Sequence, residues 1–111
     1  MNRIAIPAEA LESFEHFHDV FAEALGFPDF YGRNMNAWID CLSDIDDPAT
    51  GMTQVHVEPG DAMVLDVTAG PSVEQEVLAA LVDCAAAVNR RFADAGSETR
   101  IALALVDAPR S

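Results

Sequence analysis

The sequence predicts an α/β domain in which a small three-stranded parallel sheet packs against three to four helices. Short apolar runs at 3–6, 62–67 and 101–106 have the length and composition of strands. The middle run is nearly continuous in apolar residues, as expected for a strand buried on both faces of a parallel sheet. Helical periodicity fills the segments between the runs, and such crossovers are what parallel pairing requires. We expect one domain over residues 1–111.

The first helix is predicted from Ser13 to about Leu25. Ser13 is a favourable N-cap, and apolar residues recur at helical spacing after it. Gly26 and then Pro28 end the helix, because glycine tolerates the left-handed conformation of a helix end and proline cannot continue a helix.

A second helix is predicted from Asn34, which is a plausible N-cap, to about residue 42. One face carries a core-facing apolar stripe of Met35, Trp38 and Leu42. The opposite face displays an amide, a branched aliphatic side chain, a carboxylate and a hydroxyl, from Asn36, Ile39, Asp40 and Ser43. Together with the aromatic loop that precedes it, this face suits recognition better than catalysis.

The rest of the chain follows the same logic. Residues 43–51 are rich in turns and acids, and the alternating pattern at 53–57 predicts extended backbone. Ser72 is predicted to cap a long helix, near whose C-terminal end Arg90 and Arg91 favour the helix dipole. A tail is expected at 107–111.

Charge is the strongest compositional feature. There are 19 acidic and six basic residues, for a formal net charge of −13. Residues 29–66 contain eight acids and one base, Arg33. Such a field repels nucleic acid and anionic membranes and attracts a basic partner. An acidic surface also simply aids solubility, but the clustering of acids beside the loop and second helix favours a basic partner.

The cellular compartment is predicted from what the chain lacks. No apolar run approaches the roughly 20 residues needed to cross a bilayer. The N-terminus has no apolar signal core, so we expect a cytoplasmic protein. In that compartment Cys41 and Cys84 are expected to be free, buried thiols.

The residue patterns favour a binding protein over an enzyme. The chain contains no GxSxG elbow, no phosphate-binding glycine loop and no HExxH. The remaining nucleophile would be Cys41 activated by His18 or His56, yet Cys41 borders the buried stripe and His18 is expected to bond to backbone. The acids of 43–51 lack the glycine and terminal glutamate of a calcium loop. We therefore expect no catalytic residue, no metal and no cofactor.

A resemblance to a known family is concentrated in one stretch. Its residues are Phe27-Pro28-Asp29-Phe30-Tyr31-Gly32, then Asn34, Asn36-Ala37 and Asp40-Cys41-Leu42. This aromatic loop running into a helix resembles the barstar-like family, intracellular inhibitors of barnase-type, guanyl-specific ribonucleases. The order of elements agrees over nearly the whole chain. The resemblance implies a barstar-like fold and a stoichiometric inhibitor, or immunity protein, that plugs a ribonuclease active site with residues 29–44.

The resemblance also implies the partner-binding residues. They lie in the loop and second helix: Phe30, Tyr31, Gly32, Asn34, Asn36, Ile39, Asp40, Ser43 and Asp44. Asp40 matches the family's key aspartate and is expected to take the place of an RNA phosphate among the cations of the cleft. Structural roles stay open for several of these residues. Tyr31 or Phe30 could cap the core, Gly32 could supply a positive φ angle, and Asn34 could act chiefly as a cap.

Three departures from the family's namesake leave the partner open. Asn36 stands in place of an aspartate, Ile39 in place of a tryptophan, and Arg90 or Arg91 in place of a distal acid. We expect the partner to be a basic extracellular-type ribonuclease or related toxin, and the chain to be monomeric when free. The alternative is a barstar-fold interaction module that binds a different basic toxin or regulatory partner without inhibiting a ribonuclease.

Overall fold

The computed structural model describes residues 1–107, so residues 108–111 of the predicted tail lie outside the described part. The elements in chain order are β1 (Asn2–Ile6), the 3-10 helix η1 (Ala8–Leu11), α1 (Phe14–Leu25), α2 (Met35–Leu42), the 3-10 helix η2 (Pro48–Thr50), β2 (Ala62–Ala69), α3 (Gln75–Asp94) and β3 (Arg100–Asp107). This order confirms the predicted α/β class. Within residues 1–107, no helix combines the length and the apolar composition that crossing a bilayer demands.

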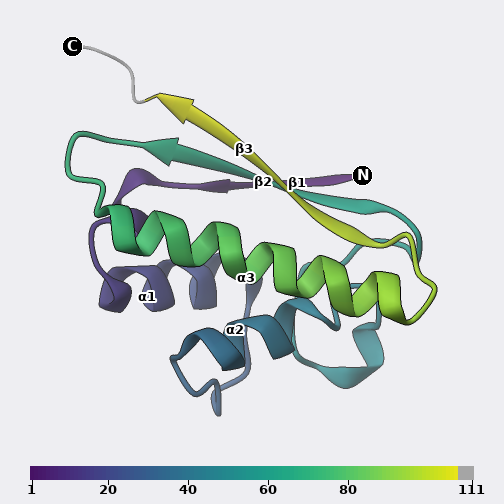
Figure 1. The fold of residues 1–111 in the computed structure, drawn as a ribbon. Coiled ribbons are helices and arrows are strands. Elements are labelled where there is room, and N and C mark those ends of the chain that lie inside the picture. Colours follow the sequence, from purple (N-terminus) through teal and green to yellow (C-terminus); the bar gives the residue numbers. More distant parts are fainter. Residues whose placement is uncertain (108–111) are drawn as a thin grey trace.

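The three strands form one parallel sheet with β2 in the centre. Ile4 of β1 pairs with Leu65 of β2, and Leu65 pairs with Leu103 of β3. The segment with α1 and α2 connects β1 to β2, while α3 connects β2 to β3. All three α-helices lie on the same side of the sheet (Figure 1).

The helices therefore cover one face of the sheet only, yet the expectation that the middle strand is buried on both faces holds for residues 62–65, all of which are buried. Leu65 faces the helices and is fully buried. On the opposite face Arg3 and Ala102, the strand neighbours of Val64, are exposed. Val64 itself is buried because it lies in the central strand. Arg3 forms an ion pair with Asp66 on this open face, with hydrogen bonds of 3.0 and 2.6 Å.

Aromatic side chains in the core join α1 to α2. Trp38 is fully buried, with its ring centroid 5.6 Å from that of Phe21 and 6.0 Å from that of Phe17. Leu42 is also fully buried, and Met35 is partly buried against the same cluster. The predicted stripe of α2 thus faces the core, and Asn36 and Asp40 on the opposite face are exposed. Ile39, predicted on that exposed face, instead packs partly against the core because it lies at the edge of the stripe.

The helix ends were predicted correctly for α1 but not for the start of α3. The Ser13 side chain caps α1 by accepting a hydrogen bond of 3.0 Å from a backbone N–H of the first turn. Gly26 ends α1 in the left-handed conformation. Ser72 does not cap α3, because the helix begins after Glu74, whose own N–H donates to Leu11 O of η1 at 2.8 Å.

The segment between α2 and β2 contains no strand. The stretch predicted as extended, 53–57, is irregular and is attached to two other parts of the chain. The N–H of Gln54 donates to Leu25 O at 2.8 Å, and that of Val57 donates to Ile45 O at 3.0 Å. Its alternating pattern therefore reflects anchoring to the core and not pairing in a sheet.

We predict that Trp38→Ala lowers the free energy of unfolding by about 3–5 kcal/mol, because it removes a fully buried aromatic side chain and leaves a cavity between α1 and α2. Phe30→Ala truncates an aromatic side chain that is 75% exposed and should change stability by less than about 0.5 kcal/mol. Urea unfolding followed by circular dichroism measures both. Equal losses in the two variants would contradict the burial of Trp38 between α1 and α2.

Candidate functional site

The loop between α1 and α2 is shaped by backbone geometry at both ends. It begins at Gly26, with φ of 65°, and ends at Arg33, with φ of 53°. The prediction that Gly32 supplies a positive φ angle is therefore wrong. A Cβ atom on Gly32 would lie 3.2 Å from Nδ2 of Asn34, so glycine leaves room for that side chain. The Asn34 side chain caps α2 as predicted, accepting a hydrogen bond of 2.8 Å from Ala37 N.

Arg33 fastens this loop to α1, although it is not among the residues predicted for the site. Its Nη1 donates to Asp19 Oδ1 at 2.7 Å, and its Nη2 to Glu15 O at 3.5 Å. The signal that could have identified it is its position as the single base between residues 4 and 89.

The two adjacent aromatic residues of the loop have different surroundings. Phe30 is 75% exposed. Tyr31 is partly buried, with its ring centroid 4.6 Å from that of Phe27 and its hydroxyl 2.6 Å from Nδ1 of His18. Tyr31 therefore anchors the loop to the core, a role that the sequence left open, whereas Phe30 presents its ring to solvent.

His18 is the buried partner in this anchor. Its expected backbone partner is replaced by the Tyr31 hydroxyl, so that prediction is wrong. Burial and the nearby Arg33 guanidinium lower the pKa of His18, although Asp19 opposes the shift. Burial raises the pKa of Tyr31. The contact is therefore a hydrogen bond between two uncharged rings at neutral pH.

The predicted recognition face of α2 reaches solvent. Asn36 is exposed, Ile39 is partly exposed, and the Asp40 side chain is 57% exposed. Ser43 is partly exposed, but its Oγ donates to Ile39 O at 2.6 Å. Asp44, just beyond the helix, is less accessible. Its pKa is raised chiefly by burial and, to a smaller extent, by the neighbouring acids.

A shallow hollow of about 150 Å³ lies between the loop and α2. The predicted site residues in its wall are Phe30, Tyr31, Gly32 and Asp40. Met52, from the segment that follows α2, also lines it and was not predicted. The remaining predicted residues do not line the hollow: Asn34, Asn36, Ile39, Ser43 and Asp44. The structure thus brings a carboxylate and an exposed aromatic ring to one recess.

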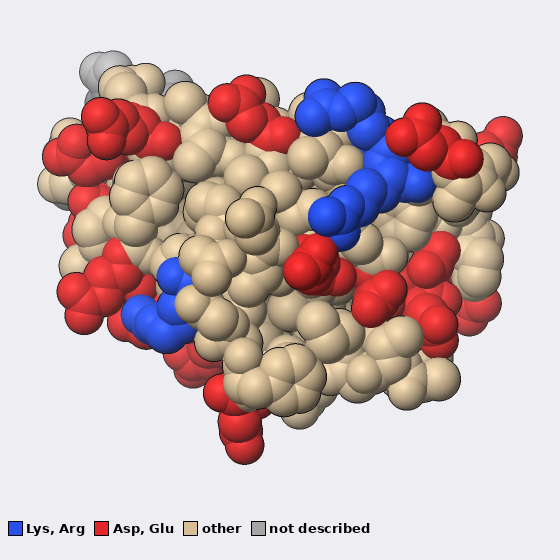
Figure 2. All heavy atoms as spheres, turned by 60° about the horizontal axis from the view of Figure 1, so that its bottom comes forward, with Lys and Arg blue, Asp and Glu red and all other residues tan. Residues whose placement is uncertain are grey.

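Asp40 is already paired within the chain. Arg91 Nη1, on α3, donates to Asp40 Oδ1 at 2.8 Å and lies 3.4 Å from Ser43 Oγ. The side chains remain 54% and 57% exposed, and such surface ion pairs contribute about 0–1 kcal/mol. Figure 2 shows arginine side chains beside acidic ones on the face that carries the helices. The Asp40 carboxylate is therefore exposed but partly neutralised.

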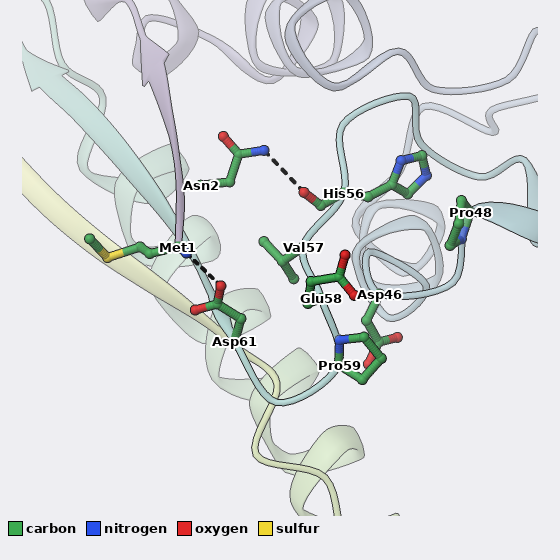
Figure 3. A pocket seen from close by; sticks show the side chains of 9 residues that line it. All are labelled: Met1, Asn2, Asp46, Pro48, His56, Val57, Glu58, Pro59 and Asp61. Carbon is green, nitrogen blue, oxygen red and sulfur yellow. Dashed lines mark hydrogen bonds and ion pairs between the residues drawn. The ribbon is translucent and has the colours of Figure 1, made fainter.

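A larger hollow, of about 350 Å³, lies elsewhere and contains no predicted site residue (Figure 3). Its acids are largely engaged inside the chain. Asp46 accepts a hydrogen bond of 2.8 Å from Thr99 Oγ1, and Asp61 pairs with the N-terminal amine of Met1. Across the part of the chain that the structure describes, no three His, Cys, Asp or Glu side chains are grouped so as to hold a metal.

Comparison with known protein families matches residues 1–104 to a family described as "Barstar (barnase inhibitor)". The chain belongs to the barstar family. A protein of Bacillus subtilis strain 168, named "Putative ribonuclease inhibitor YrdF", is 43% identical over 51 residues, which are 45% of this chain and 56% of that protein. The match thus spans about half the length of this curated relative. Membership confirms the predicted resemblance and the barstar-like fold.

The description of the barstar family also agrees with the prediction of an inhibitor and not an enzyme. The thiols fit this view. Burial, reinforced by Asp40 and Asp44, raises the pKa of Cys41 to about 11, so Cys41 is a protonated thiol at neutral pH and a poor nucleophile. Burial likewise raises the pKa of Cys84. Both cysteines are free and buried, as predicted.

We predict that acidification weakens this barstar-family fold through His18. Because its pKa is lower in the folded chain than the 6.5 of the unfolded chain, the unfolded chain binds more protons, and stability falls as the pH drops below about 6.5. Denaturant unfolding between about pH 7.5 and pH 5.5 measures this loss. His18→Gln should flatten the dependence, whereas His16→Gln, which alters an exposed neighbour, should retain it. The same slope in His18→Gln as in the wild type would refute the prediction.

Proposed function

We propose that this chain is a stoichiometric inhibitor of a small basic microbial ribonuclease of the extracellular type, and that the loop and α2, residues 29–44, block the active-site cleft of the enzyme. The observation that supports this proposal most is the position of Asp40. It offers an exposed carboxylate in the wall of an apolar hollow that also contains the exposed ring of Phe30.

The chemistry of the cleft supplies the reason. A ribonuclease binds the RNA phosphate with arginine, lysine and histidine side chains. A carboxylate can take the place of that phosphate through charge-assisted hydrogen bonds, which are bidentate when the donor is a guanidinium. Among residues 1–107, the structure gives Asp40 Oδ2 no hydrogen bond, so this oxygen is accessible to such a donor.

The charge of the whole chain supports the same class of partner. A net charge of −13 attracts a basic protein at long range and repels nucleic acid. We therefore propose that the chain acts on the ribonuclease itself and has no direct contact with RNA. The same like-charge repulsion favours a monomer when free, and two free thiols suit the reducing cytoplasm.

The rigidity of the surface also supports an inhibitor. The loop is fixed by the contact of Tyr31 with His18, by the ion pair of Arg33 with Asp19, and by the Asn34 cap. A surface that is ordered before binding loses less conformational entropy in the complex, which strengthens the affinity.

A second candidate function is favoured by two features of α2: an uncharged amide on its exposed face, and a carboxylate that is already paired with an arginine of the same chain. Asn36 is an exposed amide, and Asp40 already has a cationic neighbour in Arg91. These features would suit a barstar-fold module that binds a different basic toxin or regulatory protein and does not inhibit a ribonuclease.

We predict one-to-one inhibition when the chain is titrated against a panel of guanyl-specific microbial ribonucleases. Asp40→Ala should weaken inhibition of the responding enzyme by about 3–5 kcal/mol, more than about a hundredfold, because the cation facing it becomes buried without a partner. The measurement is residual RNA cleavage against the molar ratio of the two proteins.

Asp66→Ala is the matched control. Asp66 also pairs with an arginine, Arg3, but on the open face of the sheet. The Asp66→Ala variant loses the same charge as Asp40→Ala and should inhibit the ribonuclease about as well as the wild type. If Asp40→Ala and Asp66→Ala weaken inhibition equally, the loss comes from the change in net charge and not from a specific contact of Asp40. If the chain inhibits no ribonuclease of the panel, the second candidate function is favoured.

A further inference from the structure

Asp40, on which the proposed function depends, forms an ion pair with an arginine of the same chain, Arg91. Arg91 reaches Asp40 from α3, 51 residues away in the sequence, and makes one hydrogen bond of 2.8 Å to Oδ1. The second carboxylate oxygen receives none from residues 1–107. In the free chain Arg91 thus occupies one of the two oxygens that a bidentate partner group would engage.

We propose that Arg91 is an internal competitor for Asp40 and that it determines which partners the site accepts. This inference rests on the proposed function. A partner cation engages both oxygens of Asp40 only if it displaces Arg91 from Oδ1. The site then selects a guanidinium, because a planar fork can engage both oxygens of Asp40, whereas an ammonium group makes a weaker point contact.

The geometry makes this exchange feasible. Both side chains are more than half exposed, and apart from that to Asp40 the Arg91 guanidinium makes only the 3.4 Å hydrogen bond to Ser43 Oγ among the described residues. Two exposed hydrogen bonds, one of them long, are readily broken, while the same carboxylate buried against a partner forms stronger bonds in a drier environment. Two guanidinium groups on one carboxylate would also repel each other, so the incoming cation favours release of Arg91.

Arg90 provides a matched control one residue away. It is exposed on the same helix, and no ion pair of the described structure involves it. Arg90→Met and Arg91→Met therefore change the net charge equally, but only the second removes the cation from Asp40.

The test measures the affinity of these variants for the ribonuclease that the wild type inhibits. Arg91→Met should tighten binding about two- to fivefold more than Arg90→Met. In an Asp40→Asn background the extra gain from Arg91→Met should disappear, because there is no longer a carboxylate to compete for. Thermal unfolding checks that each variant folds. If Arg91→Met does not fold, Arg91→Gln replaces it in the affinity measurement, because it also removes the cation.

The inference is overturned if Arg91→Met gains no more than Arg90→Met, or if its gain persists with Asp40→Asn. Both results would leave one-to-one inhibition by the wild type intact. If neither the wild type nor any variant binds a ribonuclease of the panel, the proposed function fails, and the inference falls with it.

Discussion

The burial of Trp38 against Phe17 and Phe21 decides which face of α2 meets solvent. An α-helix turns about 100° per residue, so a residue two positions further along points to the far side. Asp40 is that residue, and its exposure follows from the burial of Trp38. The loop before α2 depends on the same packing, because Asn34 can cap the helix only where the core holds its first turn. The candidate site is therefore a consequence of core packing more than of local loop structure.

The sequence predicted those parts of the fold that local patterns determine. The cap at Ser13, the helix end at Gly26 and the inward stripe around Trp38 all come from residues close together in the chain. The errors arose where distant contacts decide. Glu74 and not Ser72 precedes α3 because its N–H bonds to η1. The apolar run of β2 correctly predicted the burial of Val64, but it could not show that helices cover one face of the sheet only.

The candidate site shows the same division. Helical periodicity correctly placed Asp40 on the outward face of α2, and cap preferences assigned Asn34. Periodicity could not separate the roles of Phe30 and Tyr31, because the partner that anchors Tyr31 lies 13 residues earlier, on α1. Nor could it pair Asp40 with Arg91, whose position near the end of α3 is explained equally well by the helix dipole.

Under the proposed function, long-range attraction and contact selectivity come from different groups. The excess of acids acts as a diffuse field that any basic protein would feel, although salt screens it beyond a Debye length of about 8 Å at physiological ionic strength. An unpaired carboxylate in an apolar hollow would add to that attraction but would not distinguish one basic partner from another. Pairing Asp40 with Arg91 removes little from a field of −13 charges, yet a partner that engages both carboxylate oxygens has to break a specific contact. The internal ion pair thus improves discrimination between basic partners at a small loss of attraction.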